Sequence, residues 1–264
     1  MPAVNAPPPS NAMHDAQHWY RSLPLVPRVL LTATVAVSVV GNFVLSPLHI
    51  VFHAQSIAYR LQLWRLITPF FFTPKSMDGL FNLYFLFNYS NQLNSSLFAG
   101  RNAEFVFFVL FIMTGLDILS FVMKPYILLD GLVMAIVYLW AQVNRDSEVS
   151  FMFGFRFKAI YLPLVLVAWD LLAKPSGFPV VKVMGILVGH FYFFLDKIWP
   201  EQNGDRRILK TPQFLIAMFP PTPPSGPASF GSGYTVIVPR ASAGAPDGLR
   251  VRHSWGSGQR LGDS

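Results

Sequence analysis

The sequence lacks cysteine altogether, and it has few charged residues for a chain of 264. The missing cysteine excludes a disulfide framework, a thiol nucleophile and a thiolate metal site. No stretch matches the phosphate-binding pattern Gly-x-x-x-x-Gly-Lys-Ser/Thr, so no nucleotide site and no cofactor is expected. Charged side chains make up 12% of the chain, whereas a soluble domain carries about 25%. These absences argue against a soluble globular domain.

Apolar residues dominate instead: 53% of the chain is hydrophobic, and 25 residues are Phe. Several apolar runs approach the roughly 20 residues that a helix needs to cross a bilayer of about 30 Å. We therefore expect an all-α membrane protein with six transmembrane helices. The expected spans are residues 29–45, 77–98, 103–123, 126–143, 158–173 and 180–200.

The segments outside the spans divide the chain into three regions. Residues 1–22 form a polar, Pro-rich N-terminal segment that we expect to be disordered apart from an interfacial Trp19-Tyr20 pair, and it lacks the apolar core of a cleavable signal. Residues 23–200 form the six-span domain, in which the half-apolar loop 48–75 is expected at the interface. Residues 201–264 form a Pro-, Gly- and Ser-rich tail, expected to be disordered, in which a short apolar patch at 214–219 is also expected at the interface.

Six spans place both termini on one side of the membrane. Most of the 20 Lys and Arg residues fall on that side, which predicts cytosolic termini. The net charge of +7 is spread over loops and tail, so the bilayer explains it better than a nucleic-acid partner.

The second span carries a polar stripe. Asn88, Asn91, Gln92 and Ser95 follow the spacing i, i+3, i+4, i+7, which places them on one helical face. Lipid penalises such a face, so we expect it to meet other helices or a water-filled groove.

The sixth span carries two glycines four residues apart, Gly185 and Gly189. Their missing β-carbons allow a neighbouring helix to approach closely. The alternative is an ordinary spanning helix with two tolerated glycines.

Histidines and acids offer weaker candidates. His49 and His53 have the i, i+4 spacing of a metal site, but no third ligand is evident, so we expect interfacial helix packing and no metal. Asp117, Asp130 and Asp170 allow a proton path, although isolated acids near helix ends more often cap or pair structurally.

Several blocks together resemble the derlin family, rhomboid-like proteins of the endoplasmic reticulum. The similarity covers roughly residues 19–220, and its specificity comes from the order and spacing of the blocks. They are QLWRLITPFFF with Trp64 and Arg65, FAGRNAEFVFF at 98–108, NRDSEVSFMFGFRFKAIYLP at 144–163, GILVGHFYFFLDKIWP at 185–200 and TPQFL at 211–215. The resemblance implies a rhomboid-like core in the endoplasmic reticulum membrane.

The same resemblance allows a test for protease chemistry. Rhomboid proteases use a Ser near the start of the fourth span and a His three residues before the Gly-x-x-x-Gly of the sixth. Here residues 126–143 contain no Ser, and the matching position in the sixth span is Lys182. A cationic lysine cannot accept the proton that a serine nucleophile must lose. His190 lies on the wrong side of the glycines and is expected to be a packed or interfacial histidine, so we expect a pseudoprotease without catalytic residues.

Trp64 and Arg65 have two compatible interpretations. Trp is a common interface anchor, and Arg extends toward lipid headgroups. The resemblance implies that their loop organises the lumenal half of the core and helps to engage substrates. Asn94 stands where the superfamily usually has Glu, which weakens the prediction that a carboxylate braces this loop.

The end of the tail resembles the short SHP-type motif by which derlins bind the AAA+ segregase, valosin-containing protein. Glycines permit an extended backbone, Trp255 and Leu261 suit apolar pockets, and Arg260 suits a carboxylate. The motif, at 255–262, comprises Trp255, Gly256, Gly258, Gln259, Arg260, Leu261 and Gly262.

The resemblance implies a non-catalytic role in endoplasmic-reticulum-associated degradation. The protein would assist retrotranslocation of misfolded lumenal or membrane clients and recruit the segregase, within a membrane ubiquitin-ligase complex. The alternative is a membrane scaffold that recruits the ATPase without contacting clients. A residual hydrolase or a small-solute carrier is the weakest hypothesis.

Overall fold

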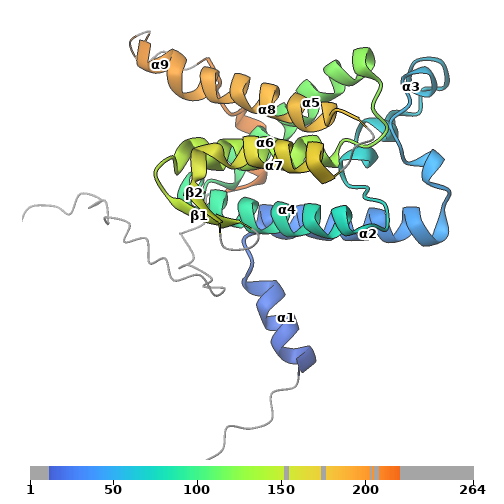
Figure 1. The fold of residues 1–264 in the computed structure, drawn as a ribbon, viewed down its shortest axis with the longest axis horizontal. Coiled ribbons are helices and arrows are strands. Elements are labelled where there is room, and N and C mark those ends of the chain that lie inside the picture. Colours follow the sequence, from blue (N-terminus) through green and yellow to red (C-terminus); the bar gives the residue numbers. More distant parts are fainter. Residues whose placement is uncertain (1–11, 152–154, 174–176, 203, 205–207, 221–264) are drawn as a thin grey trace, which may run out of the picture. The chain divides into compact units, whose positions relative to one another are not determined.

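The computed structural model describes residues 12–151, 155–173, 177–202, 204 and 208–220, which are mostly helical (Figure 1). Short 3₁₀ turns occupy Pro47–His49, Leu63–Leu66, Thr68–Phe70 and Ala159–Tyr161. The main elements are α1 (Ala12–Ser22), α2 (Leu25–Val39) with a π turn (Val40–Val44), α3 (Ala54–Arg60), α4 (Met77–Ser96), α5 (Asn102–Met123), α6 (Leu129–Val143), β1 (Glu148–Phe151), β2 (Phe155–Lys158), α7 (Leu162–Ala173), α8 (Val180–Phe193) with a π turn (Phe194–Ile198), α9 (Trp199–Gln202) and α10 (Gln213–Met218).

Helix α6 is the centre of the fold. It packs against α4 and α8, and it lies between them in Figure 1. Most of its residues from Leu129 to Ala141 are buried, on all sides of the helix. A helix that is apolar all round belongs in a core, and the sequence LVMAIVYLWA provides such a surface.

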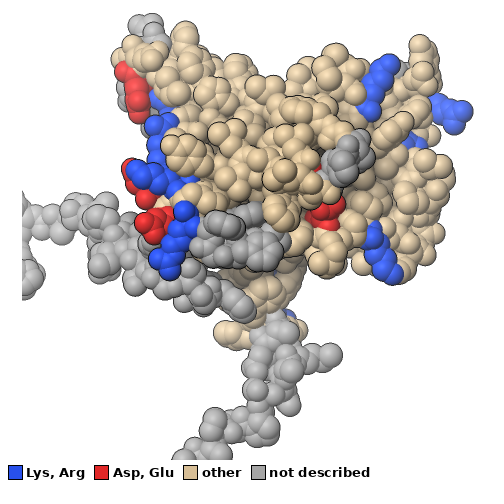
Figure 2. Space-filling view, viewed as in Figure 1, with Lys and Arg blue, Asp and Glu red and all other residues tan. Residues whose placement is uncertain are grey.

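Two helical stretches are long and apolar enough to cross a membrane, Leu25–Val44 and Asn102–Met123. The stretches Leu129–Val143 and Ala159–Ala173 are apolar but shorter. On the face drawn in Figure 2, charged side chains gather mainly toward the two ends of the helices, with a largely uncharged band between them. These observations suit a membrane protein, and the count of six crossings stays a prediction.

The prediction of disorder for residues 1–22 is wrong for Ala12–Ser22, which forms α1. The Trp19 ring lies 5.6 Å from the ring of Phe87 on α4. The hydroxyls of Tyr20 and Thr32 are 2.6 Å apart, which joins α1 to α2. Aromatic packing and this hydrogen bond therefore stabilise a segment that its composition alone marks as polar.

The all-α prediction needs one correction, because β1 and β2 form an antiparallel hairpin between the predicted fourth and fifth spans. Glu148 pairs with Lys158, and Phe151 pairs with Phe155. Valine and phenylalanine alternate here with polar residues, which favours strands. The fifth helix consequently begins at Leu162 rather than at 158.

Other helix bounds differ by a few residues. The first long helix begins at Leu25 rather than at 29, because a first turn tolerates Pro27. The apolar patch in the tail forms α10, which packs against α5 with Leu215 buried. The segregase motif at 255–262 lies outside the described residues.

Candidate functional site

A cavity of about 500 Å³ opens between α4, α6, α7 and α8, and we call it the groove. It extends from the first turn of α4 to the hairpin strand β1. Along α4 it spans residues 78–89, which is about 16 Å of helix. Its lining consists of Asp78, Leu80, Phe81, Asn82, Tyr84, Phe85, Tyr89, Asp130, Ser150, Leu166, Trp169, Asp170 and Lys182.

All the charged residues of this lining lie at one end of the groove. Asp78, Asp130 and Lys182 occupy the first turns of α4, α6 and α8, while Asp170 occupies the last turn of α7. Because α7 runs opposite to the other three helices, these turns meet at the same end. We call this end the charged mouth.

Lys182 and Asp170 form an ion pair in the charged mouth. Lys182 Nζ lies 2.6 Å from Asp170 Oδ2, and the two side chains are only 15% and 11% exposed. Charges this buried require a partner, and here each one supplies it to the other. Lys182 is therefore held by a carboxylate of α7.

A second polar contact joins α4 to α6. Asn82 Nδ2 donates a hydrogen bond to Asp130 Oδ1. Asp130 lies at the N-terminal end of α6, where the helix dipole favours a negative charge. Together with the ion pair, this contact places polar groups from four helices around one opening.

Beyond the charged mouth the groove is aromatic. Phe81, Phe85 and Tyr89 lie in succession on α4, with adjacent ring centroids 6.4 Å and 6.0 Å apart. Trp169 contributes from α7, and Ser150 adds one hydroxyl at the far end. This length of the groove suits an apolar occupant.

The polar stripe lies further along α4, largely beyond the part of this helix that lines the groove. Asn88, Asn91 and Gln92 are half-buried, Ser95 is exposed, and none of the four lines the cavity. Phe85 precedes Asn88 by three residues and Gln92 by seven, which places all three on one helical face. Gln92 Nε2 donates to Asn88 Oδ1 at 3.1 Å, and Ser95 Oγ donates to the Asn91 carbonyl at 3.0 Å. The stripe is therefore not fully buried among the other helices.

The two glycines of α8 lie against α6. A β-carbon on Gly185 would come within 2.2 Å of the Gly131 carbonyl oxygen, and one on Gly189 within 3.3 Å of Ala135 Cα. The pairing of 131 with 185 and of 135 with 189 shows that α6 and α8 run parallel. Gly131, which the sequence analysis missed, is the partner that makes the close approach possible.

Comparison with known proteins gives the family. The Der1-like family model matches residues 23–213. The chain is 40% identical to derlin-1 of Homo sapiens over 259 residues, which covers 95% of this chain and 100% of the relative. The chain belongs to the derlin family. It is also 36% identical to derlin-1 of Drosophila melanogaster, over 94% of this chain and 99% of that protein. Derlin-2 of Oryza sativa subsp. japonica is 35% identical, over 77% and 86%.

In this derlin, Arg65 organises the loop between α2 and α4. Its guanidinium donates to the carbonyl oxygens of Leu48 and Val51, at 2.8 Å and 2.7 Å, and to Gln62 Oε1 at 2.6 Å. Burial, and in addition the charge of Arg60, lowers the pKa of Arg65 from its ordinary value. Two backbone carbonyls and a side-chain amide therefore accept hydrogen bonds from the Arg65 guanidinium. The sequence analysis considers a carboxylate for the bracing of this loop.

The sequence analysis links two further residues, Trp64 and Asn94, to the loop of Arg65. Trp64 is 53% exposed, and its Nε1 donates to the His49 carbonyl at 3.4 Å. Asn94 is buried near the other end of α4, and its Oδ1 has no hydrogen-bond partner among the described residues.

The side chains of His53 and His190 form structural hydrogen bonds. His53 caps α3 by accepting from the Ser56 amide at 3.2 Å, whereas His49 lies in a 3₁₀ turn, so helix packing by the pair is wrong. Within the described ranges no group of three possible ligands gathers for a metal. His190 Nδ1 lies 2.7 Å from Tyr138 Oη, which joins α8 to α6.

The sequence analysis leaves the role of Asp117, Asp130 and Asp170 open between a proton path and structural pairing. Two of them, Asp130 and Asp170, line the charged mouth of the groove. The third, Asp117, has a buried Oδ1 without a partner in the described part of the chain.

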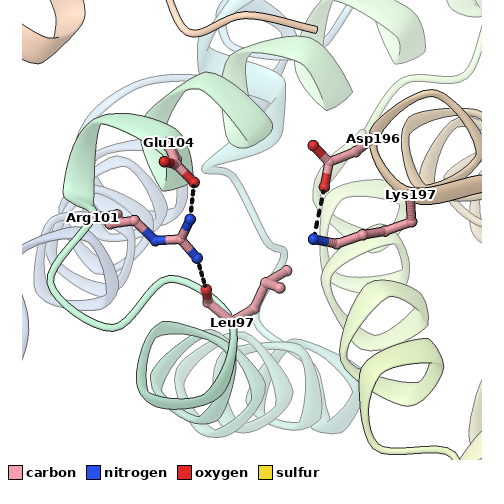
Figure 3. A network of polar contacts seen from close by, with 5 residues as sticks. All are labelled: Leu97, Arg101, Glu104, Asp196 and Lys197. Atoms are coloured by element: carbon pink, nitrogen blue, oxygen red, sulfur yellow. Dashed lines mark hydrogen bonds and ion pairs between the residues drawn. The ribbon is translucent and has the colours of Figure 1, made fainter. Parts of the chain in front are cut away.

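The opposite ends of the helices carry a second set of ion pairs (Figure 3). Arg101 reaches Glu104 at 2.9 Å and donates to the Leu97 carbonyl, and Asp196 lies 3.5 Å from Lys197. The turn before Arg101 needs Gly100, whose φ of 78° favours glycine. Both pairs fall in blocks by which the chain resembles derlins.

Proposed function

We propose that this derlin is a non-catalytic, six-span protein of the endoplasmic reticulum membrane, with cytosolic termini, that assists the retrotranslocation of misfolded proteins for degradation. The groove is the observation that supports this function best. It places polar groups and an open cavity within apolar helices, where a client's polar atoms avoid the full cost of hydrocarbon.

The state of Lys182 supports the absence of protease activity. An ammonium in an ion pair has no lone pair with which to accept a proton. The expected fourth span, 126–143, contains no serine to act as nucleophile.

The length of α7 supports a local effect on the bilayer. Together with the preceding 3₁₀ turn its described part, Ala159–Ala173, extends about 24 Å, which is short of a hydrocarbon core of about 30 Å. Leu164 and Leu172 are 63% and 81% exposed, so this short helix presents apolar side chains outward. A short lipid-facing helix thins the adjacent bilayer, which shortens the path of a client along the groove.

Force for extraction would come from the segregase bound at 255–262, because the sequence contains no phosphate-binding loop of its own. A membrane ubiquitin-ligase complex is the further partner that we propose. Replacing Trp255, Arg260 and Leu261 together with Ala should abolish recovery of valosin-containing protein with the full chain. Undiminished recovery would refute the role of the tail while leaving the groove untouched.

Crosslinking tests the groove directly. A photoreactive residue at Phe85 or Gln92 is expected to capture a client trapped during export. The same residue at Ile118 on α5, which is 64% exposed, is the control and should not capture it. Equal capture at Ile118 and Phe85 would show that clients do not use the groove.

A scaffold that only recruits the ATPase is the second candidate. One observation favours it: the four stripe side chains do not line the cavity. Replacing Asn88, Asn91 and Gln92 with Leu separates the two functions. A scaffold retains client turnover after this change, whereas a protein that conducts clients along α4 loses it.

A further inference from the structure

The register of the β1–β2 hairpin fixes which of its backbone groups point outward. Glu148 pairs with Lys158, and the Ala159 amide donates to the Ser147 carbonyl at 2.8 Å. Residues 147 and 159 are therefore a hydrogen-bonded pair, and such pairs alternate with non-hydrogen-bonded pairs along an antiparallel ladder. The N–H and C=O groups of Glu148 and Ser150 consequently point away from β2, along the outer edge of β1.

This outer edge is open within the described part of the chain. No backbone group there, outside the hairpin, hydrogen-bonds to Glu148 or Ser150, and both residues are exposed. A strand edge of this kind is a template for a further strand, because its N–H and C=O groups are positioned to pair in register. Polypeptides that add to a sheet edge bind through their main chain.

The core of the protein holds the hairpin in place. Val149 and Phe157, on the other face of the hairpin, pack against the core. Lys158 Nζ lies 3.1 Å from Asp146 Oδ1 at the base of the hairpin. An edge that is fixed before a ligand binds lowers the entropy cost of binding, since only the added segment must be ordered.

The edge of β1 lies where the groove ends. Ser150 lines the groove together with Tyr89 of α4, whereas no described residue of β2 lines it. The polar stripe of α4 begins beside this point, at Asn88. A polypeptide that emerges from this end of the groove therefore meets the outward backbone groups of β1.

We propose that the outer edge of β1 binds an extended segment of a client as an added β-strand. The inference rests on the proposed function and specifies how the client in the groove is recognised. Phe81, Phe85 and Leu166 offer no hydrogen bonds to a backbone, so the strand edge supplies partners that the aromatic length lacks. Recognition through the main chain accepts clients of unrelated sequence, which suits the export of misfolded proteins.

Photocrosslinking with a defined peptide tests the edge on the purified full chain in detergent. The protein carries a photoreactive residue in place of Glu148, and the probe is a short peptide of alternating threonine and valine. We expect this peptide to be labelled, and a twin with N-methylated amides to be labelled about threefold less. The N-methyl groups remove the N–H donors and leave the side chains unchanged.

Two results of this experiment would overturn the proposal. Equal labelling of the peptide and its N-methylated twin would show that binding does not use the main chain. Covalent dimers linked at position 148, in place of peptide adducts, would show that a second copy of the chain occupies the edge.

Two proline variants provide a matched pair. Ser150→Pro removes an outward N–H group of β1, and Arg156→Pro removes one of β2, at the residue that pairs with Ser150. Neither N–H group belongs to the β1–β2 ladder, so the hairpin keeps its hydrogen bonds. Labelling at position 148 should fall about threefold in Ser150→Pro and stay at the wild-type level in Arg156→Pro. No loss in Ser150→Pro, or an equal loss in both variants, would place the binding elsewhere.

Client capture in membranes separates this inference from the proposed function. A trapped client should be captured at Phe85 in both the wild type and Ser150→Pro, but at position 148 in the wild type only. Capture at Phe85 with undiminished capture at 148 in Ser150→Pro would refute the strand edge while the groove stands. Capture at neither position in the wild type would refute the proposed function itself.

Discussion

Lys182 in the first turn of α8 and Asp170 in the last turn of α7 form a buried ion pair at 2.6 Å. Removing one partner leaves an uncompensated buried charge. We expect Lys182→Ala or Asp170→Ala to lower the free energy of unfolding by about 3–5 kcal/mol. Thermal unfolding in detergent measures the loss. The exposed pair Lys158–Asp146, at 3.1 Å, is the control and should contribute under about 1 kcal/mol.

The same two residues allow a test of helix dipoles. Asp170 lies at the negative C-terminal end of α7, and Lys182 lies at the positive N-terminal end of α8, so each charge is on the less favourable end. The exchanged pair, Asp170→Lys with Lys182→Asp, keeps the attraction and reverses both dipole interactions. We expect its free energy of unfolding to match or exceed that of the wild type, by up to about 1 kcal/mol per helix end. An exchanged protein as unstable as the single variants would contradict this.

Gly185 and Gly189 should differ in their tolerance of a methyl group. At Gly185 the new carbon meets the Gly131 carbonyl oxygen at 2.2 Å, whereas at Gly189 the nearest atom is 3.3 Å away. We expect Gly185→Ala to cost about 3 kcal/mol and Gly189→Ala about 1 kcal/mol. Unfolding temperatures measured side by side decide the order, and equal losses would show that α6 and α8 are further apart than described.

Arg65 should not be replaceable by lysine. The guanidinium donates to three acceptors at once, whereas an ammonium cannot match this planar geometry. We expect Arg65→Lys to expose residues 45–76 to chymotrypsin several times faster than in wild type. Arg60→Lys is the matched control, because Arg60 is exposed at the end of α3, and it should leave the cleavage rate unchanged.

Glycosylation mapping tests the six crossings. A polar insertion with an acceptor sequence is expected to be glycosylated between α5 and α6, where the lumenal side is predicted. The same insertion between α4 and α5, or between β1 and β2, should stay unmodified. Modification of both loops that flank α5, or of neither loop, would contradict the predicted orientation.

Periodicity and apolar length predicted the long helices well. Helices α4 and α5 differ from the predicted bounds by two residues or fewer, because their apolar runs are long and flanked by turn residues. Helix α1 and the hairpin were missed. Helix α1 is stabilised by tertiary contacts such as Trp19 with Phe87, which no local pattern reveals, whereas the alternation that favours the hairpin was present in the sequence.

The groove was only partly predictable. The polar stripe was visible in the spacing of Asn88 and Gln92, but the charged mouth requires residues from four helices. One signal was available: Asp170 and Lys182 lie six residues on either side of residue 176, so a helical hairpin centred there places them together. The role of Gly131 depends on which helix faces α8, and spacing within one segment does not contain that information.

The close contact of Gly185 with Gly131 also sets how deformable each wall of the groove is. Backbone touches backbone between α6 and α8 at Gly131 and Gly185, so these two helices form a stiff floor of the groove. Helix α7 has an ion pair to α8 and a largely outward-facing apolar surface. Widening of the cavity by tilting α7 away from that floor therefore breaks the ion pair and also uncovers Leu162 and Leu166, which α7 buries in the core.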